Sequence, residues 1–374
     1  MNKLVETRPT SIDQPAFSSP QTTELEFARL QEVSQVDLIG FDGEVQKLCD
    51  YNYSQDLDHL VALLDTVLVR IQQVGRFTQV EALATLRDVG MVAASIRRLD
   101  IAPTSVSSRL EPILLQLGKI GDSVPRETVY SYSLWNPRGP RQRSFTGSQE
   151  EDIFIESVRT WMEELEASRR ILTTFVTETS SSIKSESMAH ELSVHFDTMV
   201  KQMVEVRRKL PTATFNTLLQ PYYYPFEVGG TSYEAPSGAH MNLLLIDQML
   251  WGRTMNEPGY TRFVAHNEMY LPPMYRQFLK NSQSSGTLIG NLRQGIDAGQ
   301  IDVHQLTVQN TLKVLLEVLH KIVSMRRIHF TLAREQDSIK VGEGNESKIT
   351  GDDILSILLR ETAKTRDQLK AYVS

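Results

Sequence analysis

The chain has 374 residues, of which 40% are hydrophobic and 23% are charged, and this composition is ordinary for a globular protein that buries a large core. Its formal net charge of -7, with lysines and arginines scattered along the chain, excludes the basic footprint that nucleic-acid binding needs, so no nucleic-acid partner is expected. Its one cysteine, Cys49, excludes a disulfide framework and multi-cysteine metal sites, and is expected to be a small buried residue.

The first residues of the chain are polar. Residues 1–25 are rich in Thr, Ser, Pro and Gln, which predicts a disordered N-terminal arm. They lack the apolar run of a secretory signal, and no later run approaches the ~20 apolar residues of a membrane-spanning helix. We therefore expect a cytoplasmic protein without a membrane partner.

Helical periodicity dominates the rest of the chain. Between residues 26 and 120, apolar side chains recur at spacings of three and four, which predicts a smaller helical domain. Three prolines and three glycines interrupt this pattern at 121–150, where a second, larger helical domain at 121–374 is expected to begin. The interruption carries four arginines, a small basic patch for an acidic protein. Helical spacing returns at 151–178 and 187–210.

A second irregular segment lies at 221–238, PYYYPFEVGGTSYEAPSG, and is too rich in proline and glycine for regular structure. Aromatic loops of this kind often line pockets, and a surface connector with its tyrosines packed on the bundle is an equal alternative. The pair Gly229 and Gly230 lacks the helix pattern that follows a dinucleotide-binding loop. No alternation of period two persists long enough to predict a sheet, so the predicted fold class is all-α.

Two histidines lie in one strongly helical segment, TLKVLLEVLHKIVSMRRIHFTLARE, at 311–335. Its apolar stripe, extended by steps of three and four, reaches Arg326 and His329, whereas His320 falls on the polar stripe. An inward-facing arginine needs an anionic partner. A haem would supply one through its propionates, with its iron accepting the imidazole. The alternative is a core histidine beside an arginine that is paired with Asp247.

Several segments resemble known haem proteins. The stretches HNEMYLPPMYRQFL (266–279) and SMRRIHFTLARE (324–335) resemble the indoleamine 2,3-dioxygenase family. PRETVYSYSLWNPRGPRQRSFTG (125–147), PYYYPFEVGGTSYEAP (221–236) and MNLLLIDQMLWG (241–252) are similar to the monodechloroaminopyrrolnitrin synthase branch of that superfamily. The similarities run in one order from about residue 80 to 374. The resemblance implies a helical-bundle haem domain of indoleamine 2,3-dioxygenase type with a smaller N-terminal helical domain.

The resemblance also implies a site. It makes His329 the proximal ligand of the iron of haem b, Arg326 the partner of a haem propionate, and Asp247 the residue that holds this arginine. Ser157 and either Tyr130 or Tyr132 correspond to distal catalytic residues. The indole slot corresponds to Phe154 and Phe215.

The chain departs from the family pattern on the distal side. In place of the arginine that clamps the substrate carboxylate it has Leu219 and Gln220, and the family's mobile glycine-rich loop is not reproduced at 348–351. Asp337 occupies the position of a substrate-binding tyrosine. A carboxylate there favours an ammonium group over a carboxylate, which predicts an amine or a differently oriented amino acid as substrate.

The sequence therefore predicts a haem-dependent oxidoreductase of secondary metabolism. Its small-molecule substrate would be tryptophan, a halogenated tryptophan or a related indole amine, oxidised or rearranged with molecular oxygen or peroxide as in pyrrolnitrin-type antibiotic biosynthesis. Two alternatives stay open: an indole 2,3-dioxygenase that gives a formylkynurenine-type product, and a non-catalytic helical haem-binding protein, which the missing clamp favours.

Overall fold

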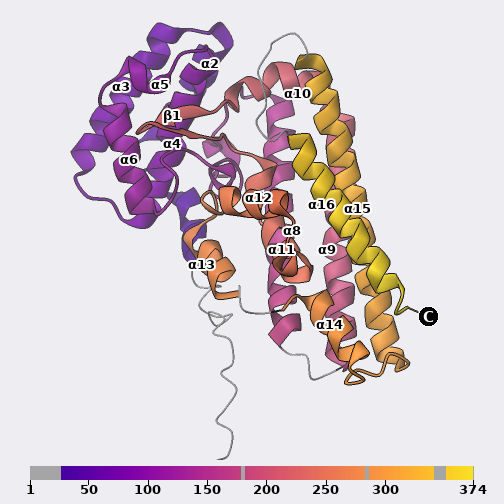
Figure 1. The fold of residues 1–374 in the computed structure, drawn as a ribbon. Helices are drawn as coiled ribbons and strands as arrows, with labels where there is room; N and C mark the ends of the chain where they lie inside the picture. Colours follow the sequence, from indigo (N-terminus) through magenta and orange to yellow (C-terminus); the bar gives the residue numbers. More distant parts are fainter. Residues whose placement is uncertain (1–26, 178–181, 283–285, 341–350, 374) are drawn as a thin grey trace, which may run out of the picture.

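A computed structural model describes residues 27–177, 182–282, 286–340 and 351–373 (Figure 1). The predicted N-terminal arm, residues 1–25, lies outside the described residues. Figure 1 shows a group of shorter helices at the N-terminal end of the chain beside a bundle of long helices. No helix in the described ranges is both long and apolar enough to cross a membrane.

In the N-terminal group, side chains cap the first turns of the two longest helices, which begin at Leu57 and Gln79. The Asp56 carboxylate accepts the backbone N–H of His59, and Thr78 and Glu81 form a reciprocal capping box. The elements are η1 (Glu32–Gln35), η2 (Phe41–Gly43), α2 (Val45–Ser54), α3 (Leu57–Val74), α4 (Gln79–Arg97), α5 (Pro103–Val106) and α6 (Leu110–Gly121).

The bundle is built from four long helices. They are α8 (Gln149–Thr177), α9 (Ser182–Lys209), α15 (Leu306–Lys340) and α16 (Gly351–Lys370). Helix α9 packs against both α8 and α15, and α15 packs against α16 (Figure 1). The short elements α7 (Val129–Tyr132) and η3 (Gly139–Arg141) precede the bundle in the chain.

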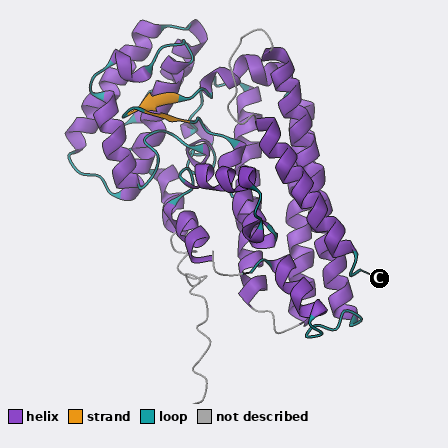
Figure 2. Ribbon diagram, in the orientation of Figure 1, coloured by secondary structure: helices purple, strands orange, loops and turns teal. Residues whose placement is uncertain are grey.

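Shorter elements connect α9 to α15. They are α10 (Thr212–Leu218), η4 (Gln220–Tyr222), β1 (Phe226–Val228), β2 (Thr231–Tyr233), η5 (Gly238–His240), α11 (Leu243–Leu250), η6 (Gly252–Thr254), α12 (Pro258–Glu268), α13 (Pro273–Ser282) and α14 (Leu288–Asp297). The strands form an antiparallel hairpin in which Phe226 faces Tyr233 (Figure 2). Its turn residues Gly229 and Gly230 have φ of 60° and 74°, the left-handed backbone that a two-residue hairpin turn requires.

The prediction of an all-α fold is confirmed, and the hairpin is a small addition to it. Three-residue strands are too short to show an alternating pattern, so the segment 221–238 could not be predicted to contain strands from its sequence. The hairpin packs on the N-terminal group, where β1 contacts α5 and α6.

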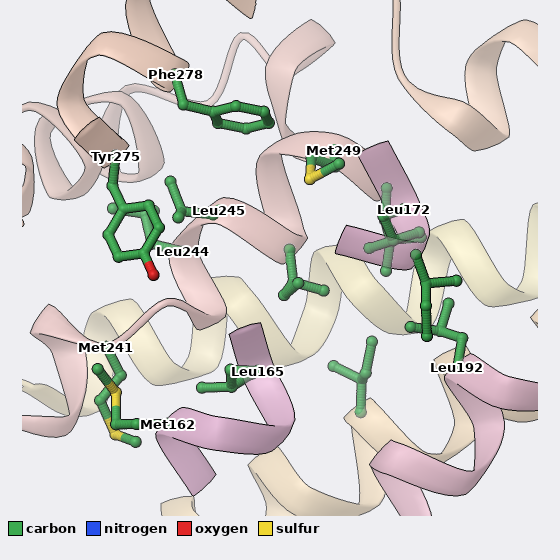
Figure 3. Close-up of a cluster of buried hydrophobic side chains, with 14 of the residues drawn as sticks. Met162, Leu165, Leu172, Leu192, Met241, Leu244, Leu245, Met249, Tyr275 and Phe278 are labelled. Carbon is green, nitrogen blue, oxygen red and sulfur yellow. The ribbon is translucent and has the colours of Figure 1, made fainter. Parts of the chain in front are cut away.

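The bundle core is a large cluster of buried apolar side chains. Figure 3 shows part of it, where side chains of α8, α9, α11 and α13 point toward one another. A second cluster fills the N-terminal group and includes residues beyond position 120, among them Phe145, Ile155 and Phe226. The division at 120 into two domains stays a prediction, and the second core draws on both sides of it.

The four arginines of the 121–150 segment are engaged within the fold. Arg126 and Arg143 are buried, and Arg126 also donates to the backbone carbonyl of Tyr233 on the hairpin. Buried guanidinium groups need anionic or carbonyl partners, so these arginines hold the segment in place and do not form a free basic surface. The carboxylate partners of the four are Asp37, Asp42, Asp88, Glu127, Glu156 and Glu163.

Leu245 of α11 is fully buried where α8, α11 and α13 meet. We predict that Leu245→Ala lowers the free energy of unfolding by about 2–5 kcal/mol, because it removes buried methyl groups and leaves a cavity. Val194→Ala on the exposed face of α9, where the side chain is 61% exposed, should change it by less than about 0.5 kcal/mol. Urea denaturation of both variants measures this, and equal losses would contradict the assignment of Leu245 to the core.

Candidate active site

A cavity of about 640 Å³ opens among α8, α9, α10, α15 and the loop segments between residues 220 and 243. This volume lies within the range of small-molecule sites, and the lining is mostly apolar and aromatic. Residues predicted from separate parts of the sequence meet here. They are Tyr132, Phe154, Ser157, Phe215, Gln220 and His329.

His329 is presented to this cavity by α15, together with Leu332 one turn later. The His329 side chain is accessible, and its accessible surface forms part of the cavity wall. Burial, and then the positive charge of Arg326, lower the pKa of His329. The imidazole is therefore neutral at neutral pH, the state that offers a lone pair to a metal. His320 lies on the exposed face of the same helix, as the periodicity predicts.

The backbone at Gly238 lies against His329. A Cβ atom placed on Gly238 would come within 3.8 Å of the imidazole Cε1 atom. The loop that contains Glu234, Ala235, Pro236 and Ser237 also lines the cavity, so this loop and α15 form adjoining parts of its wall.

Arg326 is buried one turn before His329 and is absent from the cavity lining. Its guanidinium donates to the Asp247 carboxylate of α11 and to the Thr362 hydroxyl of α16. Burial raises the pKa of Asp247 to about 6, against the opposing pull of Arg326. The structure thus combines one feature of each possibility that the sequence left open: His329 lines a cavity, whereas Arg326 is paired with Asp247 away from the cavity lining.

Four aromatic side chains form a continuous wall of the cavity. Phe154 lies 5.1 Å from Phe215, 6.0 Å from Tyr132 and 6.2 Å from Tyr223, measured between ring centroids. Phe215 and Tyr223 are nearly parallel, at 7° between their planes. Such a wall suits a flat aromatic ligand. The sequence did not single out Tyr223, although it lies in the aromatic loop at 221–238.

Ser157 and Tyr132 already donate their hydroxyl protons within the protein. Ser157 donates to the backbone carbonyl of Phe154 at 2.7 Å, which leaves lone pairs of its hydroxyl oxygen free to accept a hydrogen bond. Tyr132 donates at 2.7 Å to Glu151, a fully buried carboxylate in the first turn of α8. Glu151 also accepts the backbone N–H groups of residues 145 and 146. Sequence reasoning missed Glu151, which holds the Tyr132 ring in place.

The structure places Tyr130 in the bundle core, outside the cavity lining. Its hydroxyl donates to the Asn242 amide oxygen, and its ring packs beside Trp135 and Tyr275. Of the two tyrosines that the resemblance offered, Tyr132 is the one at the cavity.

The altered distal positions are only partly described. Leu219 is buried and Gln220 lines the cavity. The side chain of Asp337 and residues 348–350 lie outside the described part of the chain, so the predicted ammonium contact of Asp337 stays a prediction. Two charged residues that the sequence did not indicate also line the cavity, Arg207 of α9 and Glu234 of the loop.

A model of the monodechloroaminopyrrolnitrin synthase PrnB family matches residues 31–371. The chain belongs to this family. The match confirms the resemblance to the synthase branch and extends it upstream of residue 80, to the start of the N-terminal helical group. The family is one of pyrrolnitrin biosynthesis, with an indole substrate derived from tryptophan, and this places the chain among enzymes of antibiotic metabolism.

From the buried Asp247–Arg326 pair we predict that the contribution of Asp247 to the stability of the protein decreases as the pH rises. Because burial raises the folded-state pKa of Asp247 to about 6, above about 3.9 for an unfolded aspartate, the folded protein holds this proton more tightly. The contribution of Asp247 to stability is therefore greatest below pH 4 and falls as the pH rises through 6, by at most about 3 kcal/mol.

Urea denaturation between pH 4 and 7 measures this for the native protein and Asp247→Asn. The difference in unfolding free energy between them should decrease with rising pH. Asp58→Asn, at an exposed position of α3, serves as the control and should track the native protein. A difference that is constant across this range would contradict the buried position of the Asp247 carboxylate.

Proposed function

We propose that this protein is a haem-dependent enzyme that oxidises or rearranges the indole ring of tryptophan, a halogenated tryptophan or a related indole amine in pyrrolnitrin-type secondary metabolism. Oxygen or peroxide is the oxidant. The observation that carries the proposal is His329 at the wall of a cavity of about 640 Å³ in a chain of the synthase family.

The residues at the cavity fit a haem. Among the described residues, no three His, Cys, Asp or Glu side chains gather as a metal site, so ligation through one imidazole suits this part of the chain. His329 would be the ligand, and haem b, when bound, supplies the iron centre that activates the oxidant. We assign the contact with a haem propionate to Arg207, since this residue lines the cavity. The ion pair between Arg326 and Asp247 would instead hold α15 against α11.

The aromatic wall would orient the substrate. An indole ring that stacks beside Phe154 and Phe215 is desolvated on its faces, and the Ser157 oxygen is available to accept the indole N–H. Tyr132 completes the wall because Glu151 fixes its phenol. These residues position the ring and exclude water, which is the part of the catalysis that the protein supplies.

The first test of this function is the visible spectrum after haem is added to purified protein. We predict that His329→Ala loses the Soret band of the native complex and that added imidazole restores it, because free imidazole replaces the missing ligand. His320→Ala, at an exposed position of the same helix, should bind haem like the native protein. A native-like Soret band in His329→Ala without imidazole would overturn the proposal.

The second test concerns the indole N–H. We predict that Ser157→Ala weakens the binding of indole roughly fivefold, the effect of losing one hydrogen bond worth ~1 kcal/mol, and leaves the binding of 1-methylindole unchanged. Calorimetric titration of the haem-loaded protein measures both ligands. An equal loss for the two would show that Ser157 acts through packing and not through the indole nitrogen.

A further inference from the structure

The carboxylate of Glu234 is held in place by contacts to two histidines. Its Oε1 atom lies 3.0 Å from Nε2 of His266 on α12, and its Oε2 atom lies 3.3 Å from Nε2 of His240 in η5. The backbone N–H of Glu234 donates to the Tyr270 hydroxyl at 2.8 Å. Two histidines thus contact the carboxylate and Tyr270 holds the backbone of Glu234, which positions this negative charge beside the cavity that Glu234 lines.

His240 is a buried support for this carboxylate. Its ring is fully buried and is stacked on Tyr270 at 3.9 Å between centroids, with 5° between the planes. Burial lowers the pKa of His240, so the neutral ring contacts Glu234 without cancelling its charge. His240 first, and then His266, lower the pKa of Glu234 to about 2 against the effect of burial. Glu234 is therefore ionised throughout the physiological range.

The carboxylate keeps capacity for a further partner. The Glu234 side chain is 51% exposed, and an ionised carboxylate has about four acceptor positions, of which the two histidines use only part. Glu234 belongs to the same loop as Gly238, whose backbone lies against His329. Within the described lining, its counterpart of opposite sign is Arg207 on α9.

We propose that Glu234 binds the ammonium group of the substrate, with His240 and His266 as positioning residues. The cavity is thereby specific for indoles that carry an aliphatic amine over indoles that carry a carboxylate alone. A fixed anion beside a mostly apolar cavity attracts an ammonium group and repels a carboxylate. This assignment rests on the proposed indole chemistry and deepens it, because it names the residue that recognises the amine substituent of the indole substrate.

Calorimetric titration of the haem-loaded protein with three probes tests the assignment: tryptamine, neutral 3-methylindole and anionic indole-3-propionate. We expect Glu234→Gln to weaken tryptamine binding at least about tenfold, the usual effect of losing a charge-assisted hydrogen bond, and to leave 3-methylindole binding unchanged. Indole-3-propionate should bind more tightly to this variant, because repulsion is removed.

Two further variants separate recognition from folding. Glu234→Asp keeps the charge and should bind tryptamine more tightly than Glu234→Gln does. Glu227→Gln removes an exposed carboxylate on the neighbouring strand β1, outside the cavity lining, and should bind all three probes like the native protein.

The outcomes distinguish this inference from the proposed function. An equal loss of all three probes in Glu234→Gln, or an unchanged preference for tryptamine over indole-3-propionate, overturns the role of Glu234 and leaves the indole enzyme standing. A native protein that binds none of the three probes overturns the indole assignment and the role of Glu234 with it. Loss of the Soret band in His329→Ala tests haem ligation by His329, and its outcome does not depend on the indole assignment or on the role of Glu234.

Discussion

The buried contact between Arg326 and Asp247 is the constraint on which the position of His329 depends. A guanidinium removed from water requires a carboxylate partner, and here the pair joins α15 to α11, with the Thr362 hydroxyl of α16 as a further acceptor. Three helices are therefore tied together one turn before His329. Because residues three apart lie on the same side of a helix, this contact sets which way the imidazole faces.

The cavity that His329 faces is assembled from parts that are distant in the chain. Helix α7 contributes Tyr132, α8 contributes Phe154 and Ser157, and α10 contributes Phe215. Glu151 couples two of these parts, since it belongs to the first turn of α8 and accepts the Tyr132 phenol. The aromatic wall thus depends on the packing of α7 against α8.

The charged side chains at the cavity come from segments other than the one in which the sequence suggested a charged clamp. The resemblance to the dioxygenases predicts that Leu219 and Gln220 stand where that family has an arginine clamp, and such a loss alone would favour a protein without catalysis. The cavity nevertheless has an arginine and a carboxylate, Arg207 from α9 and Glu234 from the loop after the hairpin. A comparison limited to the clamp segment misses both residues, because neither belongs to it.

The sequence by itself determined the features that depend on short-range periodicity and on family resemblance. Apolar spacing of three and four specified the helices and the all-α class, and it pointed to His329, which lines the cavity, in preference to His320, which does not. Matching segments identified the family, and its model covers residues 31–371. The aromatic loop was recognisable from composition, and its hairpin was not, because three-residue strands carry no usable alternation.

Only the tertiary structure decided which side chains meet. Tyr130 and Tyr132 are two residues apart on one helical turn, so they point in nearly opposite directions, one into the core and the other into the cavity. The position of the Glu234 carboxylate is likewise set by two residues of other elements, His240 of η5 and His266 of α12. Periodicity reports which face of an element is buried, whereas a site depends on which buried faces are brought together, and that is set by packing over long separations in the chain.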